Sequence, residues 1–100
     1  MVLFCEYIVL MEHLAAFHAW VKHHPEHWNH AQLLENVGQP GVYVEVWQAN
    51  DAQHAATIEK ERREGRSWKE MEQWLKTGSN GSGVLRIWTF RPVAGGIIGQ

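Results

Sequence analysis

The chain has 100 residues, of which 45% are hydrophobic and 20% are charged, and its net charge is −2 at pH 7. This composition is typical of one globular domain and excludes a disordered chain. No basic stripe is present that would release counterions from nucleic acid, so we expect no nucleic-acid partner.

The N-terminal run MVLFCEYIVLM is apolar, but it lacks a basic leader region and contains Glu6. It is also too short to span a bilayer. We therefore predict a first strand over residues 3–11, no membrane partner and a cytoplasmic location. The single cysteine, Cys5, fits a reducing compartment.

Residues 12–24 change to a helical period, with Leu14, Phe17 and Val21 on one face. Pro25 disfavours helical geometry at the residue before it and so predicts the end of this helix. The helix would then pack its apolar face onto the sheet to which the first strand belongs.

A hairpin is predicted after this helix. Residues 28–37 are compatible with a strand, and GQPG at 38–41 signals a turn. The next segment, VYVEVWQ at 42–48, alternates strictly and is the clearest strand in the chain. Two strands joined by such a turn form an antiparallel pair.

A second helical region follows over residues 51–64, with Asn50 or Asp51 as its N-cap and Gly65 at its end. SWKE at 67–70 has the form of a capping box and predicts a further short helix. The apolar stripe of that helix is expected to be core: Trp68, Met71 and Leu75.

The rest of the chain is predicted to be a flexible loop at 77–83, a last strand at 84–90 and a flexible tail at 93–100. The predicted order is β-α-β-β-α-β, with the second helical region in two pieces, within one α+β domain over residues 1–92.

This order, the divided second helix and the aromatic last strand LRIWTFRP resemble a ferredoxin-like domain of the dimeric α+β barrel superfamily. That superfamily includes antibiotic-biosynthesis monooxygenase-like and NIPSNAP-like domains. The resemblance implies a four-stranded antiparallel sheet in strand order 4-1-3-2, helices on one face, and a homodimer whose sheets pack face to face. It also implies a cavity for a hydrophobic ligand. Activities in the superfamily vary widely, so the fold alone selects none of them.

Alternation predicts two faces on the strand at 42–48. We expect the valine face (Val42, Val44 and Val46) to lie under the helices, so that the opposite face meets the partner sheet. Four aromatic side chains assigned to that inner face would form an exposed patch without a partner, which favours a homodimer. They are the expected ligand-binding residues: Tyr43, Trp47, Trp88 and Phe90.

Glu6 is expected on the same inner face, because a charge under the helices costs more than a charge in a cavity or at its rim. Strand order 4-1-3-2 then places Glu6 between Arg86 and Glu45. Two carboxylates that share one guanidinium are candidates for a general acid or base. The alternative is a structural ion pair at the dimer interface. His30 is the fourth catalytic candidate, with a half-buried, hydrogen-bonded histidine as the alternative.

Residues 18–30, HAWVKHHPEHWNH, contain five of the seven histidines. His23 and His27 have the i, i+4 spacing of metal ligands, but Pro25 lies between them and nothing completes a tetrahedral set. We therefore expect no metal and no cofactor, with His27 exposed. Cys5 is expected to be a buried thiol on the helix side.

The charged run EKERREGR at 59–66 is interpreted as a solvated face. The function hypothesis is a homodimer that binds a hydrophobic or aromatic small molecule at the sheet face, with cofactor-independent monooxygenase-like chemistry. The alternative is a non-catalytic dimerisation or stress-related module. The sequence contains no motif that identifies a substrate.

Overall fold

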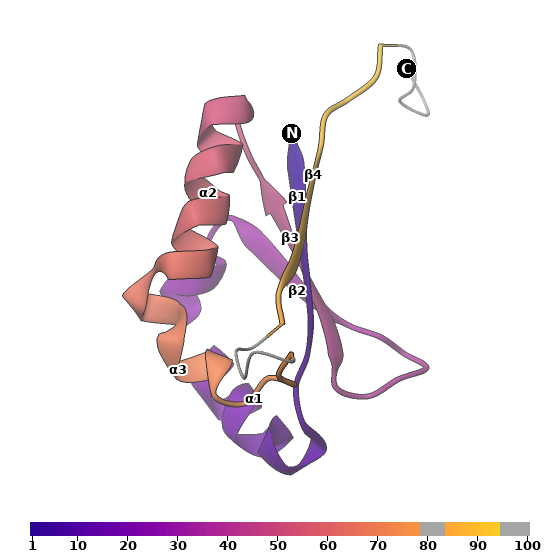
Figure 1. Cartoon of the computed structure of the whole chain (residues 1–100), viewed down its shortest axis with the longest axis vertical. Helices are drawn as coiled ribbons and strands as arrows, with labels where there is room; N and C mark the ends of the chain where they lie inside the picture. The colour runs from indigo at the N-terminus through magenta and orange to yellow at the C-terminus, as the bar shows by residue number, and fades with distance from the viewer. Residues whose placement is uncertain (79–83, 95–100) are drawn as a thin grey trace.

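A computed structural model describes residues 1–78 and 84–94 (Figure 1). The described residues form four strands, three α-helices and three short 3-10 turns. Their bounds in chain order are Val2–Ile8 (β1), Met11–His13 (η1), Leu14–His23 (α1), Pro25–Trp28 (η2), Ala31–Glu35 (β2), Val42–Gln48 (β3), Ala52–Glu64 (α2), Arg66–Trp68 (η3), Lys69–Glu72 (α3) and Arg86–Phe90 (β4).

The four strands form one antiparallel sheet in the order β2-β3-β1-β4. This is the expected order 4-1-3-2 counted from the opposite edge. The molecule is therefore an α+β domain with a four-stranded antiparallel sheet, compatible with a ferredoxin-like fold. The register places Cys5 of β1 opposite Glu45 of β3, and Glu6 opposite Arg86 of β4.

The helices lie on one side of the sheet, as Figure 1 shows, and among the described residues no helix covers the other side. The covered face carries Cys5, Tyr7, Tyr43 and Glu45, which are all buried. The predicted assignment of the two faces of β3 is therefore wrong, because the valine face is the open one. Alternation shows which residues share a face, but both faces of β3 are rich in apolar side chains, so the pattern does not show which face the helices cover.

The placement of Glu45 also explains this error. The cost of an isolated buried charge was the reason to place Glu6 on the face away from the helices, and Glu45 was assigned to the same face as Glu6. In the structure Arg62 of α2 lies beside Glu45 and supplies the opposite charge. The helix-covered face therefore accommodates an acidic residue.

Helix boundaries follow from local interactions. Asp51 Oδ1 accepts a hydrogen bond of 2.8 Å from the backbone N–H of His54, which confirms Asp51 as the N-cap of α2. Gly65 ends α2, and a Cβ at this position would lie 2.5 Å from the carbonyl oxygen of Glu61, so the close approach requires glycine. The capping box predicted at 67–70 does not form, since η3 occupies its first half without a side-chain cap.

The strand predicted at 42–48 is confirmed as β3, whereas the other three strands are shorter than predicted, and β1 ends at Ile8. The strand predicted at 28–37 is reduced to β2, because the segment that Pro25 begins folds as the turn η2. The predicted loop at 77–83 and tail at 93–100 lie mostly outside the described residues.

The core lies between the covered face of the sheet and the helices. Phe17 of α1 is fully buried and packs against Tyr7 and Tyr43, with ring centroids 6.2 Å and 4.8 Å away. The predicted core stripe on the short helix is also confirmed, since these three side chains are buried: Trp68, Met71 and Leu75. None of the helices in the described part of the chain has both the length and the apolar character needed to cross a bilayer.

Candidate functional site

An ion pair lies at the centre of the covered face. Glu45 comes from β3 and is 0% exposed, and Arg62 comes from α2 and is 1% exposed. Arg62 Nε donates to Glu45 Oε1 and Arg62 Nη2 donates to Glu45 Oε2, both at 2.8 Å. This bidentate geometry matches the flat guanidinium to the flat carboxylate and is the strong form of the interaction.

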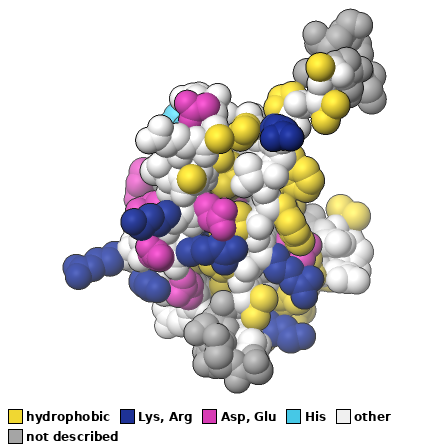
Figure 2. Space-filling model, turned by 45° about the horizontal axis from the view of Figure 1, so that its top comes forward, with side chains coloured by type: hydrophobic (Ala, Val, Ile, Leu, Met, Phe, Trp, Pro, Cys, Tyr) yellow, Lys and Arg dark blue, Asp and Glu magenta, His cyan; other side chains and the backbone are white. Residues whose placement is uncertain are grey.

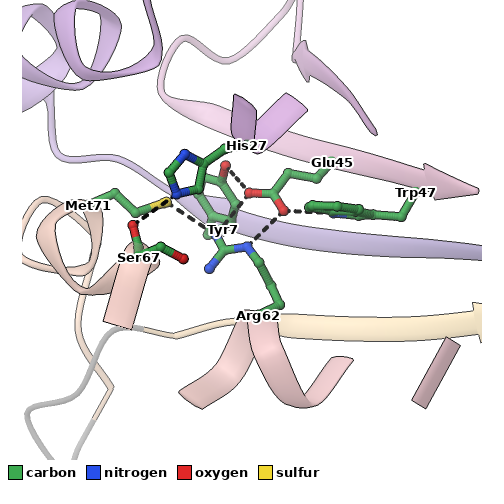
Figure 3. A network of polar contacts seen from close by, with 7 residues as sticks. All are labelled: Tyr7, His27, Glu45, Trp47, Arg62, Ser67 and Met71. Atoms are coloured by element: carbon green, nitrogen blue, oxygen red, sulfur yellow. Dashed lines mark hydrogen bonds and ion pairs between the residues drawn. The ribbon is translucent and has the colours of Figure 1, made fainter. Parts of the chain in front are cut away.

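Two further donors complete the surroundings of the carboxylate (Figure 3). The Tyr7 hydroxyl donates to Glu45 Oε2 at 2.5 Å, and the indole Nε1 of Trp47 donates to Glu45 Oε1 at 2.9 Å. Each carboxylate oxygen therefore accepts two hydrogen bonds, which uses the acceptor capacity of the group. The network ties β1, β3 and α2 to one another without an unpaired negative charge.

The guanidinium also contacts the segment after α2. Its central carbon lies 4.1 Å from the ring centroid of Trp68, and Nη2 lies 3.2 Å from Met71 Sδ. Within the described residues, Nη1 of Arg62 has no hydrogen-bond partner. Burial alone lowers the pKa of Arg62, but the charge and hydrogen bonds of Glu45 outweigh it and raise the pKa above its usual range.

The tyrosine in this network keeps its proton. Burial, followed by the negative charge of Glu45, raises the pKa of Tyr7 well above its usual range. The hydroxyl therefore remains a donor to the carboxylate at neutral pH. A carboxylate with four donors and no exposed surface has no free lone pair for a substrate proton, so this arrangement stabilises the fold.

The structure divides the predicted site residues between two faces. Glu45, Tyr43 and Trp47 lie on the helix-covered face and not at a cavity between sheets. The Tyr43 hydroxyl and His18 Nε2 lie 2.6 Å apart and share a hydrogen bond. The predicted cluster of Glu6, Glu45 and Arg86 is therefore wrong, because Glu45 has the opposite parity and pairs with Arg62.

The other predicted residues remain together on the open face. Glu6 and Arg86 are directly opposite in the register, and Trp88 and Phe90 follow Arg86 on the same side of β4. Trp88 is 45% exposed and Phe90 is 54% exposed. A pocket of about 200 Å³ adjoins this group. Its lining consists of Glu6, Tyr7, Ile8, Lys76, Thr77, Val84 and Arg86.

His30 is exposed directly before β2, at the rim of the sheet. His27 differs from its prediction, because its side chain is only 9% exposed. The turn η2 folds His27 against η3, where its Nε2 donates to the carbonyl oxygen of Ser67 at 3.1 Å. No group of three or more His, Cys, Asp or Glu side chains among the described residues could hold a metal ion.

Arg62 is the residue that the sequence interpretation missed. It lies in the run 59–66, which was interpreted as a solvated face. A signal for its burial was present, because Ala55, Ile58 and Arg62 have the i, i+3, i+7 spacing of one helix face. That face contacts the sheet, so the one charged residue on it requires an acidic partner there.

The thiol of Cys5 is predicted to be unreactive in the folded protein. Cys5 is buried on the helix side, as expected, and burial followed by Glu45 raises its pKa to about 12. At pH 8 a thiol with this pKa is ionised to about one part in ten thousand, and the thiolate is the reactive form. Absorbance after addition of an aromatic disulfide reagent should show no thiol without denaturant and one thiol per chain in guanidinium. Rapid reaction of the folded protein would contradict this placement.

No protein-family model, curated protein or solved structure matches this chain. Its function must therefore be inferred from the geometry of its own residues.

Proposed function

We propose that the chain forms a homodimer through its open sheet face and binds an aromatic small molecule at the edge of the interface. The apolar character of that face is the observation that supports the proposal. A sheet covered on one side normally presents polar residues to water on the other side. This open face instead carries mostly apolar side chains: Val2, Phe4, Ile8, Leu34, Val42, Val44, Val46, Trp88 and Phe90.

The surface view agrees with this asymmetry. In Figure 2, many charged side chains lie on the left and centre of the molecule, whereas the right side carries a run of hydrophobic side chains with a few charged ones among them. Contiguous apolar surface of this kind marks interaction sites on soluble proteins. Two copies packed face to face, with the helices outside, would have the architecture of a dimeric α+β barrel.

Charge on the open face favours a second copy of the same chain as the partner. Glu6 and Arg86 lie side by side in the register, and within the described residues neither forms an ion pair. A two-fold axis brings the same patch of both subunits together, so each acidic group can face the basic group of the other subunit. The open face is therefore apolar, and its charges are complementary to those of the same face on a second subunit.

The pocket of about 200 Å³ beside Arg86 supports the ligand part of the proposal. Ile8 and Val84 supply apolar walls, and Lys76 and Arg86 supply positive charge. An aromatic molecule with an acidic group fits this lining. Binding is proposed in place of a monooxygenase-like reaction, because Glu45, one of the two carboxylates expected to share Arg86, is held on the other side of the sheet and leaves only Glu6 beside Arg86.

Sedimentation equilibrium tests the dimer. Wild type should be a dimer at micromolar concentration, and Phe90→Lys should weaken association by at least about 30-fold, since burying an unpaired charge in an apolar interface costs about 2 kcal/mol or more. Ala56→Lys, on the exposed side of α2, is the matched control and should remain a dimer. A wild type that is monomeric over the whole concentration range would refute the proposal.

Calorimetric titration with 2-naphthoate tests the pocket. Wild type should bind this probe, and Arg86→Gln should weaken binding by about tenfold, because one charge-assisted hydrogen bond is lost. The control Arg91→Gln removes an exposed arginine that follows the other end of β4, outside the pocket, and should leave binding unchanged. Equal binding by all three proteins would show that Arg86 does not recognise the ligand.

A further inference from the structure

A second pocket, of about 390 Å³, opens on the helix-covered side of the sheet, away from the proposed dimer face. It lies where η2, the beginning of β2, β3, the end of α2 and η3 meet. Its lining consists of Glu26, His27, His30, Trp47, Glu61, Ser67 and Trp68. We propose that this pocket binds a primary ammonium group carried on an aromatic or apolar body.

The charge of the lining supports a cationic ligand. Glu26 and Glu61 are both acidic and exposed, and the described lining contains no lysine or arginine. The nearest buried cation, Arg62, is already neutralised by Glu45. A positive ligand therefore meets two carboxylates without an opposing charge from the lining.

The indole walls are fixed in place before any ligand binds. Trp47 is held by its hydrogen bond to Glu45, and its ring centroid lies 5.8 Å from that of Trp68. Trp68 in turn contacts Trp20 and Trp28 at 6.0 Å and 5.6 Å between centroids. Arg62 already stacks over Trp68, which shows that a cation is stable against this ring. A rigid aromatic wall reduces the ordering that binding must impose.

The Nδ1 of His27, unpaired among the described residues, is the observation that favours a ligand with N–H groups. Its Nε2 donates to the carbonyl oxygen of Ser67, which in the neutral imidazole leaves Nδ1 as an acceptor. Nδ1 has no hydrogen-bond partner among the described residues, and Glu26 Oε1 lies 3.5 Å from it. When His27 is neutral, two acceptors thus face each other with no donor between them. An ammonium group can donate to both, whereas a quaternary ammonium, which lacks N–H groups, cannot.

The ring of His27 is also held in position. It lies 4.7 Å from Trp68 and 5.1 Å from Trp20 between centroids, and its side chain is almost fully buried. Rotation of the ring to expose Nδ1 would break the hydrogen bond to Ser67, so a ligand reaches Nδ1 only when the exposed Glu26 side chain beside it turns aside. An unmet acceptor on a fixed, buried ring is costly unless a donor is supplied, and a ligand can supply it.

Calorimetric titration with 2-phenylethylamine tests the proposal, with 2-phenylethanol as a neutral probe of similar shape. Wild type should bind the amine saturably with one molecule per chain, and tryptophan fluorescence should change in parallel. The alcohol should bind at least about tenfold more weakly, because it lacks the charge that the two carboxylates recognise. Absence of saturable amine binding, or equal binding of the alcohol, would overturn the proposal.

Two variants locate the binding site. Glu26→Gln and Glu61→Gln should each weaken amine binding by about tenfold, whereas Glu70→Gln, on exposed α3 surface outside the pocket, should bind like wild type. These side chains are exposed, so far-ultraviolet circular dichroism should be unchanged. Phe90→Lys should also bind the amine normally, which separates this pocket from the proposed dimer. Unchanged binding in both Glu26→Gln and Glu61→Gln would overturn the assignment.

Discussion

Replacing Arg62 with methionine should lower the free energy of unfolding by about 3–5 kcal/mol at pH 7, the typical cost of removing one partner of a buried ion pair. Methionine retains an unbranched apolar stem, so the change mainly removes the guanidinium. Glu45 would then remain at 0% exposure with only the donors Tyr7 and Trp47. Urea denaturation, followed by circular dichroism, measures the loss.

The loss in Arg62→Met should be smaller at pH 5 than at pH 7. Without the guanidinium, the folded variant gains more than the unfolded chain from a proton on Glu45, because protonation removes an uncompensated buried charge. A group that binds a proton more tightly in the folded state stabilises the fold at low pH, and this contribution decreases as the pH rises. Urea denaturation of wild type and Arg62→Met at both pH values shows whether the loss of stability is smaller at pH 5.

Arg63→Met is the matched control on the same helix. Arg63 pairs with Glu59 at 3.0 Å, but the two side chains are 43% and 39% exposed. An exposed i, i+4 pair contributes only about 0.3–0.5 kcal/mol. Equal losses in Arg62→Met and Arg63→Met would mean that the ion pair of Glu45 and Arg62 does not exist in the folded protein.

The sequence was sufficient for the order of the elements and for local details that depend on neighbouring residues. The N-cap at Asp51 follows from its side chain and the next turn of backbone, and the core stripe of Trp68, Met71 and Leu75 follows from spacing. The burial of Cys5 was also predicted, because its parity on β1 was assigned correctly. Each of these inferences depends on residues close together in the chain.

The candidate site could not be predicted fully, because it depends on contacts between distant residues. Glu45 and Arg62 are 17 residues apart, and their pairing decides which face of β3 can lie under the helices. Both faces of β3 carry apolar side chains, so alternation does not show which face the helices cover. The ion pair with Arg62 of α2 decides it. The same limit applies to His27, whose contact with Ser67 joins segments 40 residues apart.

The second large effect is expected at Trp68. Trp68→Ala should lower the free energy of unfolding by about 3–5 kcal/mol, because a buried indole is removed and a cavity remains. Trp68 is 3% exposed and contacts three other tryptophan rings. Thermal and urea denaturation of the variant measure the loss.

Trp68→Phe separates packing from the contact with the cation. Phenylalanine keeps an aromatic face against Arg62, so Trp68→Phe should lose clearly less stability than Trp68→Ala. A double-mutant cycle of Trp68→Ala with Arg62→Met should give a coupling energy of about 1–2 kcal/mol, since a desolvated cation over an indole contributes about that much. Strictly additive losses would show that the guanidinium is held by Glu45 alone and that its stacking on Trp68 contributes no stability. The contact between Arg62 and Trp68 would then no longer support the inference that Trp68 stabilises a cation bound in the second pocket.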